Sequence, residues 1–123
     1  MIRLVAEGYF LLLRCEFLIA SGKTTPLRRI VEAQRANASR VGYSIQTISH
    51  AMDLACVFYP KSVFCLQRSA ATILLLRRRG IPAELVIGAQ LLPFRSHAWV
   101  ELNGVVINDK PYMHDIYQVL ERW

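Results

Sequence analysis

Apolar residues in the first 80 positions recur at intervals of three and four, which is typical of helices that bury one face. The pattern predicts four helices, over residues 1–20, 27–37, 44–58 and 62–80. Pro26 stands where the second could begin, and Tyr59-Pro60 ends the third. Ser62 is expected to cap the fourth helix and Gly80 to end it, after arginines that suit the negative end of its dipole.

After Gly80 the hydrophobic period changes to two, which predicts strands over residues 83–90, 97–102 and 105–109. Residues 110–123 are expected to form a short helix or a loop. The fold class is therefore α+β, with a helical N-terminal half packed on a small antiparallel sheet. With 123 residues, one domain is expected over 1–123. Its helical region would cover 1–60, and the fourth helix and the strands 61–123.

Composition narrows the environment and the partners. Hydrophobic residues make up 54%, enough for a real core, and the net charge of +6 favours acidic partners such as nucleic acid, an anionic membrane surface or an acidic peptide. Three cysteines without a CxxC pair argue against a disulfide framework and against zinc, so reduced thiols in a cytoplasm are expected. No metal or cofactor is expected.

The apolar start of the chain resembles a signal peptide, but Glu7, Arg14 and Glu16 interrupt it. A membrane-spanning helix needs about 20 mostly uncharged residues. We interpret residues 1–20 as a buried or partner-facing helix, with membrane association as the alternative.

The stretch "SHAWVELNGVVIND" (96–109) places a histidine and an aspartate on consecutive strands. A two-residue turn at Asn103-Gly104 would pair Leu102 with Val105 and send Asp109 to the face opposite His97, leaving Asn108 on the face of His97. A three-residue loop with a bulge would pair Glu101 with Val105 and set His97 opposite Asp109. The residues alone leave both registers open.

A histidine beside a carboxylate is typical of general acid–base chemistry, and such a pair needs a nucleophile. Cys65 falls in the first turn of the fourth helix, where unpaired N–H groups and the positive end of the dipole favour a thiolate. Each residue also fits a structural role: Cys65 as a small buried hydrophobe, His97 as a hydrogen-bonded structural histidine and Asp109 as the start of a turn. Cys15 and Cys56 lie within apolar helical patterns and are expected to fill the core.

Residues 62–109 closely resemble a known family. The features are Cys65-Leu66 followed by Arg68-Ser69, "LLRRRGIPAELVIG" at 75–88, and "HAWVE" at 97–101 with an aspartate after the next strand. These are similar to the leader peptidases of lasso peptide biosynthesis, cysteine proteases with a transglutaminase-like, papain-like core. The resemblance implies Cys65 as nucleophile, His97 as general base and then acid, and Asp109 as the orienting carboxylate, and it favours the bulged register.

The resemblance also implies a substrate and partners. The substrate would be a ribosomally made precursor, cut between leader and core, with a threonine favoured near the end of the leader. A separate ATP-dependent cyclase would then close the macrolactam ring. The residues ahead of Cys65 are expected to be helices that leave no room for a leader-recognition domain, so a separate recognition protein is expected. The first helix and the arginines of 28–40 are the expected docking surface, and their alternative is a core helix with a solvated basic face.

Three other functions remain open at this point. The same three residues could carry transglutaminase-like acyl transfer or deamidation. The basic charge would suit a nucleic-acid-binding module, although the arginines scatter over several segments and no recognition motif stands out. The chain could also be an inactive scaffold that retains the fold.

Overall fold

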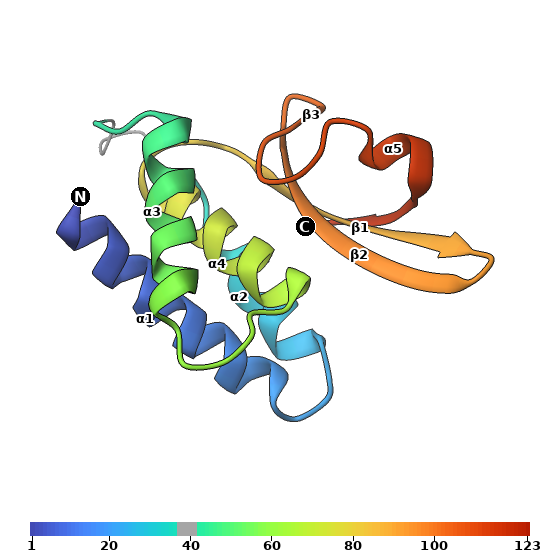
Figure 1. Cartoon of the computed structure of the whole chain (residues 1–123), viewed down its shortest axis with the longest axis horizontal. Helices are drawn as coiled ribbons and strands as arrows, with labels where there is room; N and C mark the ends of the chain where they lie inside the picture. Colours follow the sequence, from blue (N-terminus) through green and yellow to red (C-terminus); the bar gives the residue numbers. More distant parts are fainter. Residues whose placement is uncertain (37–41) are drawn as a thin grey trace.

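A computed structural model describes residues 1–36 and 42–123. In these residues the helices are α1 (Ile2–Ile19), α2 (Thr25–Ala33), α3 (Ile45–Phe58), α4 (Cys65–Arg78) and α5 (Met113–Ile116), and the strands are β1 (Glu84–Leu91), β2 (Phe94–Leu102), β3 (Val105–Val106) and β4 (Gln118–Arg122). Figure 1 shows α1 to α4 gathered on one side of the molecule, with the twisted hairpin of β1 and β2 and the short α5 on the other. The α+β prediction is confirmed. Asn37, at the end of the second expected helix, and Arg40 lie outside the described residues.

Helix α4 forms the centre of the fold. Residues 69–76 of this helix are all buried, including Ile73 and three successive leucines at 74–76. It contacts α1 and α3 on one side and β2 on the other. Each fully buried leucine or isoleucine contributes about 1.5–3 kcal/mol through removal of apolar surface from water. The start of α4 is thereby held rigidly against the sheet.

The two ends of α4 differ in how well the sequence predicted them. At the C-terminal end Gly80 adopts a φ of 84° and donates its N–H to Arg77 O, while Ile81 N–H reaches Leu76 O, so the predicted glycine cap is confirmed. At the N-terminal end the prediction of Ser62 as cap is wrong. Phe64 is the capping residue, in an extended conformation, and α4 begins at Cys65. The extended segment before Cys65 therefore runs three residues further than expected.

The arginines at the end of α4 do not form a purely solvated helix end. The Arg77 guanidinium donates to the carbonyl oxygens of Val31 (2.6 Å), Ala83 (3.1 Å) and Trp123 (2.8 Å), and burial lowers its pKa. Arg78 and Arg79 both pair with Glu7 of α1. These contacts tie α1, α2 and the C-terminal residue to α4.

The strands form one antiparallel sheet in the order β3-β2-β1-β4. One face, with Leu85, Ala98 and Val100, packs on the helices. The opposite face carries a small second cluster of Val86, Trp99 and Met113 of α5, against which Tyr117 and Val119 pack. The sequence did not predict β4, which pairs with β1, because four of its five residues are exposed and its pattern resembles a loop.

Two further strand boundaries differ from expectation. Strand β2 begins at Phe94, three residues before the predicted start, because it pairs with β1 along its whole length. Strand β3 covers only residues 105–106 of the predicted 105–109. The chain leaves the sheet after Val106, which determines where Asp109 lies.

Helix α1 is amphipathic, with Leu4, Leu11, Leu12 and Cys15 fully buried and Phe10 and Phe17 exposed. Its buried face confirms that it belongs to the core, and its exposed aromatics leave a partner-facing role open. Within the described ranges, none of the helices is both long and apolar enough to cross a membrane.

Candidate active site

Cys65 lies in the first turn of α4, as the sequence predicts, and is the first residue of the helix. The first N–H groups of an α-helix have no partner within the helix, and they carry the positive end of its dipole. Phe64 makes no side-chain capping hydrogen bond to them. The cysteine sulfur therefore lies at a helix end whose N–H groups are available to an anion, either a thiolate or the oxyanion of a substrate.

His97 and Asp109 are in direct contact. Nε2 of His97 lies 2.5 Å from Oδ2 of Asp109, and the side chains of both residues are one-quarter exposed. The other carboxylate oxygen, Oδ1, accepts the backbone N–H of Lys110 at 2.8 Å. A carboxylate held in this way fixes the orientation of the imidazole and stabilises its protonated form. Nδ1 is the ring atom left for a second partner.

The contact between His97 and Asp109 forms in the register of the two-residue turn, which was expected to place the two side chains on opposite faces. Leu102 pairs with Val105 across a two-residue turn, so the bulged register favoured by the family resemblance is wrong. Asn103 and Gly104 have φ values of 52° and 80°, the two successive positive angles that a tight hairpin turn requires and that Asn-Gly supplies readily. The expectation that Asp109 would point to the face opposite His97 assumed a strand that continues to residue 109, whereas β3 ends at Val106.

Asn108 redirects the chain toward His97. Its Oδ1 accepts the backbone N–H of Val100 at 2.7 Å, where the strand ladder would otherwise supply a carbonyl. Its Nδ2 donates to Oγ of Ser69 on α4 at 3.2 Å, and Ser69 in turn donates to the carbonyl of Ala98 at 3.1 Å. Asn108 thus links β2 to α4 and holds the backbone that carries Asp109.

The three predicted residues open onto one pocket of about 250 Å³. Its lining residues are Val63, Cys65, Arg68, Ser69, His97, Ala98, Asn108 and Asp109. The sulfur at the helix end and the imidazole–carboxylate pair thus share one cleft at the junction of α4 and the sheet. The arrangement brings together a thiol, an imidazole in contact with a carboxylate, and the N–H groups of a helix start, a set of groups that suits nucleophilic attack on a carbonyl.

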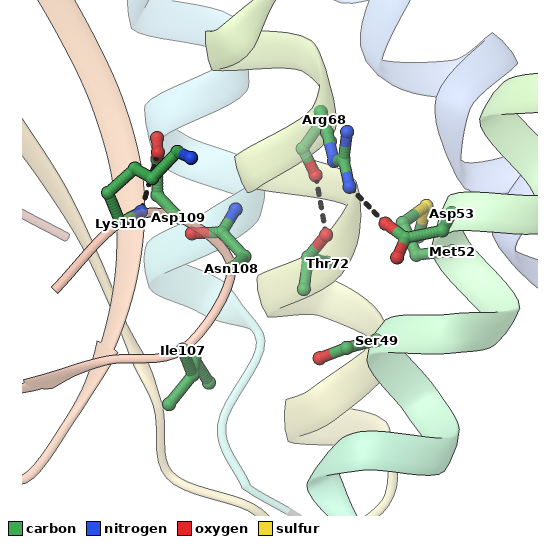
Figure 2. A pocket seen from close by; sticks show the side chains of 9 residues that line it. All are labelled: Ser49, Met52, Asp53, Arg68, Thr72, Ile107, Asn108, Asp109 and Lys110. Carbon is green, nitrogen blue, oxygen red and sulfur yellow. Dashed lines mark hydrogen bonds and ion pairs between the residues drawn. The ribbon is translucent and has the colours of Figure 1, made fainter.

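A larger pocket of about 430 Å³ adjoins the first and shares Arg68, Asn108 and Asp109 with it. Figure 2 shows that residues 107–110 border it on one side and α3 and α4 on the other, with the ion pair between Arg68 and Asp53 at one end. The lining is mostly polar. Ser49, on α3, has a buried Oγ without a hydrogen-bond partner. This pocket offers room for a substrate side chain beside the cysteine.

A family comparison bears on the whole arrangement. The family model of the transglutaminase-like superfamily matches residues 10–122. This range includes Cys65, His97 and Asp109. The chain belongs to the transglutaminase-like superfamily. No solved structure matches this transglutaminase-like chain significantly.

One curated relative is similar over part of its length. The Escherichia coli protein McjB, named Microcin J25-processing protein, is 50% identical over 56 residues. The match covers 46% of this transglutaminase-like chain and 27% of the relative, so the chain spans only a fraction of that protein.

The other two cysteines lie apart from the cleft. Cys15 is fully buried in the core, and burial raises the pKa of its thiol to about 12. Cys56 is partly buried, and desolvation raises its pKa as well. A thiol with a raised pKa is a poor nucleophile near neutral pH, so the expectation that both fill the core agrees with their surroundings.

Sequence reasoning missed several residues that shape the site of this transglutaminase-like protein. Ser69 and Asn108 connect α4 to β2, and Tyr117 stacks on His97 with ring centroids 5.3 Å apart. Ser69 was visible only as part of the quoted "Arg68-Ser69" motif. Tyr117 gave no signal because it lies in the segment that was expected to be a short helix or a loop.

Proposed function

We propose that this chain is a cysteine peptidase that removes the leader from a ribosomally made lasso peptide precursor and so frees the core for macrolactam cyclisation. The observation that carries the proposal is that Cys65, at the uncapped start of α4, opens onto the same pocket as the contact between His97 and Asp109. The printed name of the similar E. coli protein, a processing protein for microcin J25, supports this substrate class.

The first half of the reaction forms an acyl-enzyme. The imidazole of His97 takes the proton of the Cys65 thiol through Nδ1, because Nε2 is engaged by Asp109. The thiolate attacks the carbonyl carbon of the scissile peptide bond, and the N–H groups at the start of α4 stabilise the oxyanion. As the C–N bond breaks, the imidazolium gives its proton to the departing α-amine of the core.

The second half releases the leader. Neutral His97 takes a proton from a water molecule, which attacks the thioester carbonyl. The C–S bond breaks, the leader departs with a free carboxylate, and the imidazolium returns its proton to the sulfur of Cys65. Asp109 holds the imidazole in place throughout. The reaction consumes one water molecule, and none of these steps calls for a metal or cofactor.

The larger pocket suits the side chain of the threonine that the family favours near the end of the leader. Seven of its nine lining residues are polar or charged, and it shares Arg68, Asn108 and Asp109 with the pocket of Cys65.

A separate leader-recognition protein is part of this proposal, and the cyclase is a further partner. The exposed side of α1, with Phe10, Leu13 and Phe17, and the arginines of α2 are the proposed docking surface. A leader held by the partner raises the effective concentration of the scissile bond at Cys65.

The experiment uses the full chain, a synthetic leader–core peptide and the recognition protein, with mass spectrometry of the products. Peptidase activity splits the precursor into leader and core at one bond. Deamidation would add about a dalton without a cut, since an amide becomes an acid. Acyl transfer would add the mass of a supplied amine less that of the ammonia released. An intact precursor in every mixture would contradict all three.

The nucleic-acid-binding alternative has less support. Arg28, Arg68 and Arg122 pair with carboxylates within the molecule, and Arg77 binds backbone carbonyls. Groups engaged in this way are not free for phosphates. Salt-sensitive binding to random duplex DNA would revive that function.

A further inference from the structure

The imidazole of His97 packs against two aromatic rings that belong to the second cluster of the sheet. Its centroid lies 5.3 Å from that of Tyr117, at an interplanar angle of 27°, and 6.1 Å from that of Trp99, at 26°. Trp99 and Tyr117 also contact each other, with centroids 6.0 Å apart. Three rings from β2 and from the residue before β4 therefore pack together next to the pocket, with the planes of Trp99 and Tyr117 tilted by 38°.

Gly88 makes this stack feasible. It lies directly opposite His97 in the pairing of β1 with β2. A Cβ atom at residue 88 would lie 2.7 Å from Cη2 of Trp99 and 2.9 Å from Cβ of Tyr117. Real side chains essentially never approach so closely, so any larger residue would displace both rings. Because residue 88 has no side chain, Trp99 and Tyr117 can pack against the backbone of β1 and beside the imidazole of His97.

Glu101 anchors the indole of Trp99. Its carboxylate is fully buried, and it accepts hydrogen bonds from Trp99 Nε1 at 2.6 Å, His114 Nε2 at 2.5 Å and Arg122 Nη1 at 3.1 Å. Trp99 is itself fully buried. A buried indole anchored through its N–H to a carboxylate with three donors has little freedom to turn.

We infer that Trp99 and Tyr117 are positioning residues: held by Glu101 and by the space at Gly88, they fix the ring plane of His97 in the pocket that it shares with Cys65. Asp109 alone restrains the imidazole at one atom and leaves rotation about the Nε2 contact open. The packing of two further rings against the imidazole restricts that rotation. This role rests on the proposed function for its effect on rate, although its effect on the imidazole does not.

The test combines nuclear magnetic resonance of His97 with kinetics on the full chain. Nearby aromatic rings shift the imidazole ring proton signals, so Tyr117→Leu should move the His97 signals measurably. It should also lower kcat for leader cleavage by about 10-fold or more while KM stays near its wild-type value, because a small displacement of a reacting group is costly. Tyr117→Phe retains the ring and should rescue both readouts.

Gly88→Ala is the second variant, and it should act on Trp99 and Tyr117 together. Its matched control is Gly42→Ala, which adds the same methyl group where no atom lies within 4 Å. Gly88→Ala should shift the His97 signals and lower kcat, whereas Gly42→Ala should leave both unchanged. If Gly88→Ala fails to fold, Tyr117→Leu still decides the matter.

The outcomes separate this inference from the proposed function. Unchanged His97 signals and kcat in folded Tyr117→Leu would overturn the positioning role. Shifted signals with an unchanged kcat would do so as well, because the loss of the Tyr117 ring would then have no consequence for the reaction. If the wild-type protein cleaves no precursor, the proposed function fails, while signals that shift in Tyr117→Leu and recover in Tyr117→Phe would still support the contact between Tyr117 and His97.

Discussion

Nε2 of His97 lies 2.5 Å from Oδ2 of Asp109, within the pocket that also contains Cys65. The contact uses one nitrogen of the imidazole and leaves the other for a second partner. In the proposed mechanism His97 moves protons while Asp109 orients it. The consequences of removing each residue should therefore differ in size.

Asp109→Ala should reduce kcat without abolishing cleavage. The proton-transfer group would still be present but poorly oriented, so we expect a loss of about 10- to 100-fold, below the roughly 10²–10⁴-fold that a general acid–base group itself contributes. His97→Ala should be the more damaging of the two. Equal losses in kcat for the two variants, measured with the leader–core peptide, would argue against a purely orienting role for Asp109.

Asn108→Ala should lower both stability and activity. It leaves the backbone N–H of Val100 and the hydroxyl of Ser69 without their partner, and an unsatisfied buried group costs about 1–3 kcal/mol. The backbone that carries Asp109 also loses its link to β2. Urea unfolding gives the stability change and the cleavage assay the rate. A variant with wild-type stability would show that Asn108 does not hold this segment.

Cys15→Ser should change stability more than rate. It places a hydroxyl group in the apolar core, at a cost of about 1–3 kcal/mol, far from the cleft. Cys56→Ser is the milder comparison because that residue is only partly buried. Thermal unfolding and kcat measured on the same samples check both. A large loss of kcat in a folded Cys15→Ser protein would contradict the assignment of this thiol to the core.

Glu101 predicts a pH dependence of stability. Burial raises the pKa of Glu101, but the hydrogen bonds from Trp99, Arg122 and His114 together outweigh burial and leave the pKa below its ordinary value of 4.5. A depressed folded-state pKa stabilises the fold above the unfolded-state pKa, and this stability is lost as the pH falls through the folded value.

The stability gap between the wild type and Glu101→Gln should therefore be widest at neutral pH and should narrow below about pH 4.5. Chemical unfolding at several pH values measures it. Glu84→Gln is the matched control, since Glu84 lies directly opposite Glu101 in the sheet but is exposed. A gap that does not change with pH would mean that folding leaves the pKa of Glu101 unshifted, and a gap that narrows as the pH rises would mean that the buried carboxyl is neutral in the folded protein.

The sequence predicted the elements whose signal is local. The arginines and Gly80 marked the end of α4, and the period of two marked β1 and β2. Asn103-Gly104 is a residue pair typical of the two-residue hairpin turn that the structure contains. The residues alone nevertheless left both registers open. The family resemblance favoured the other register, because the contact between His97 and Asp109 was assumed to need it.

The parts that the sequence did not predict depend on tertiary contacts. Strand β4 exists because it pairs with β1, since its exposed residues carry little pattern of their own. The role of Asn108 depends on the strand ending at Val106, and the value of Gly88 depends on where Trp99 and Tyr117 lie. None of these can be read from residue spacing within a single element.

The most direct test of the central claim is leader cleavage by Cys65→Ala, measured beside Cys56→Ala as a matched control of the same substitution. If Cys65 supplies the nucleophile of the pocket that it shares with His97 and Asp109, Cys65→Ala should fold normally and release no core peptide. Cys56→Ala should cleave the precursor at a rate close to that of the wild type. Core release by Cys65→Ala at a wild-type rate would contradict the claim.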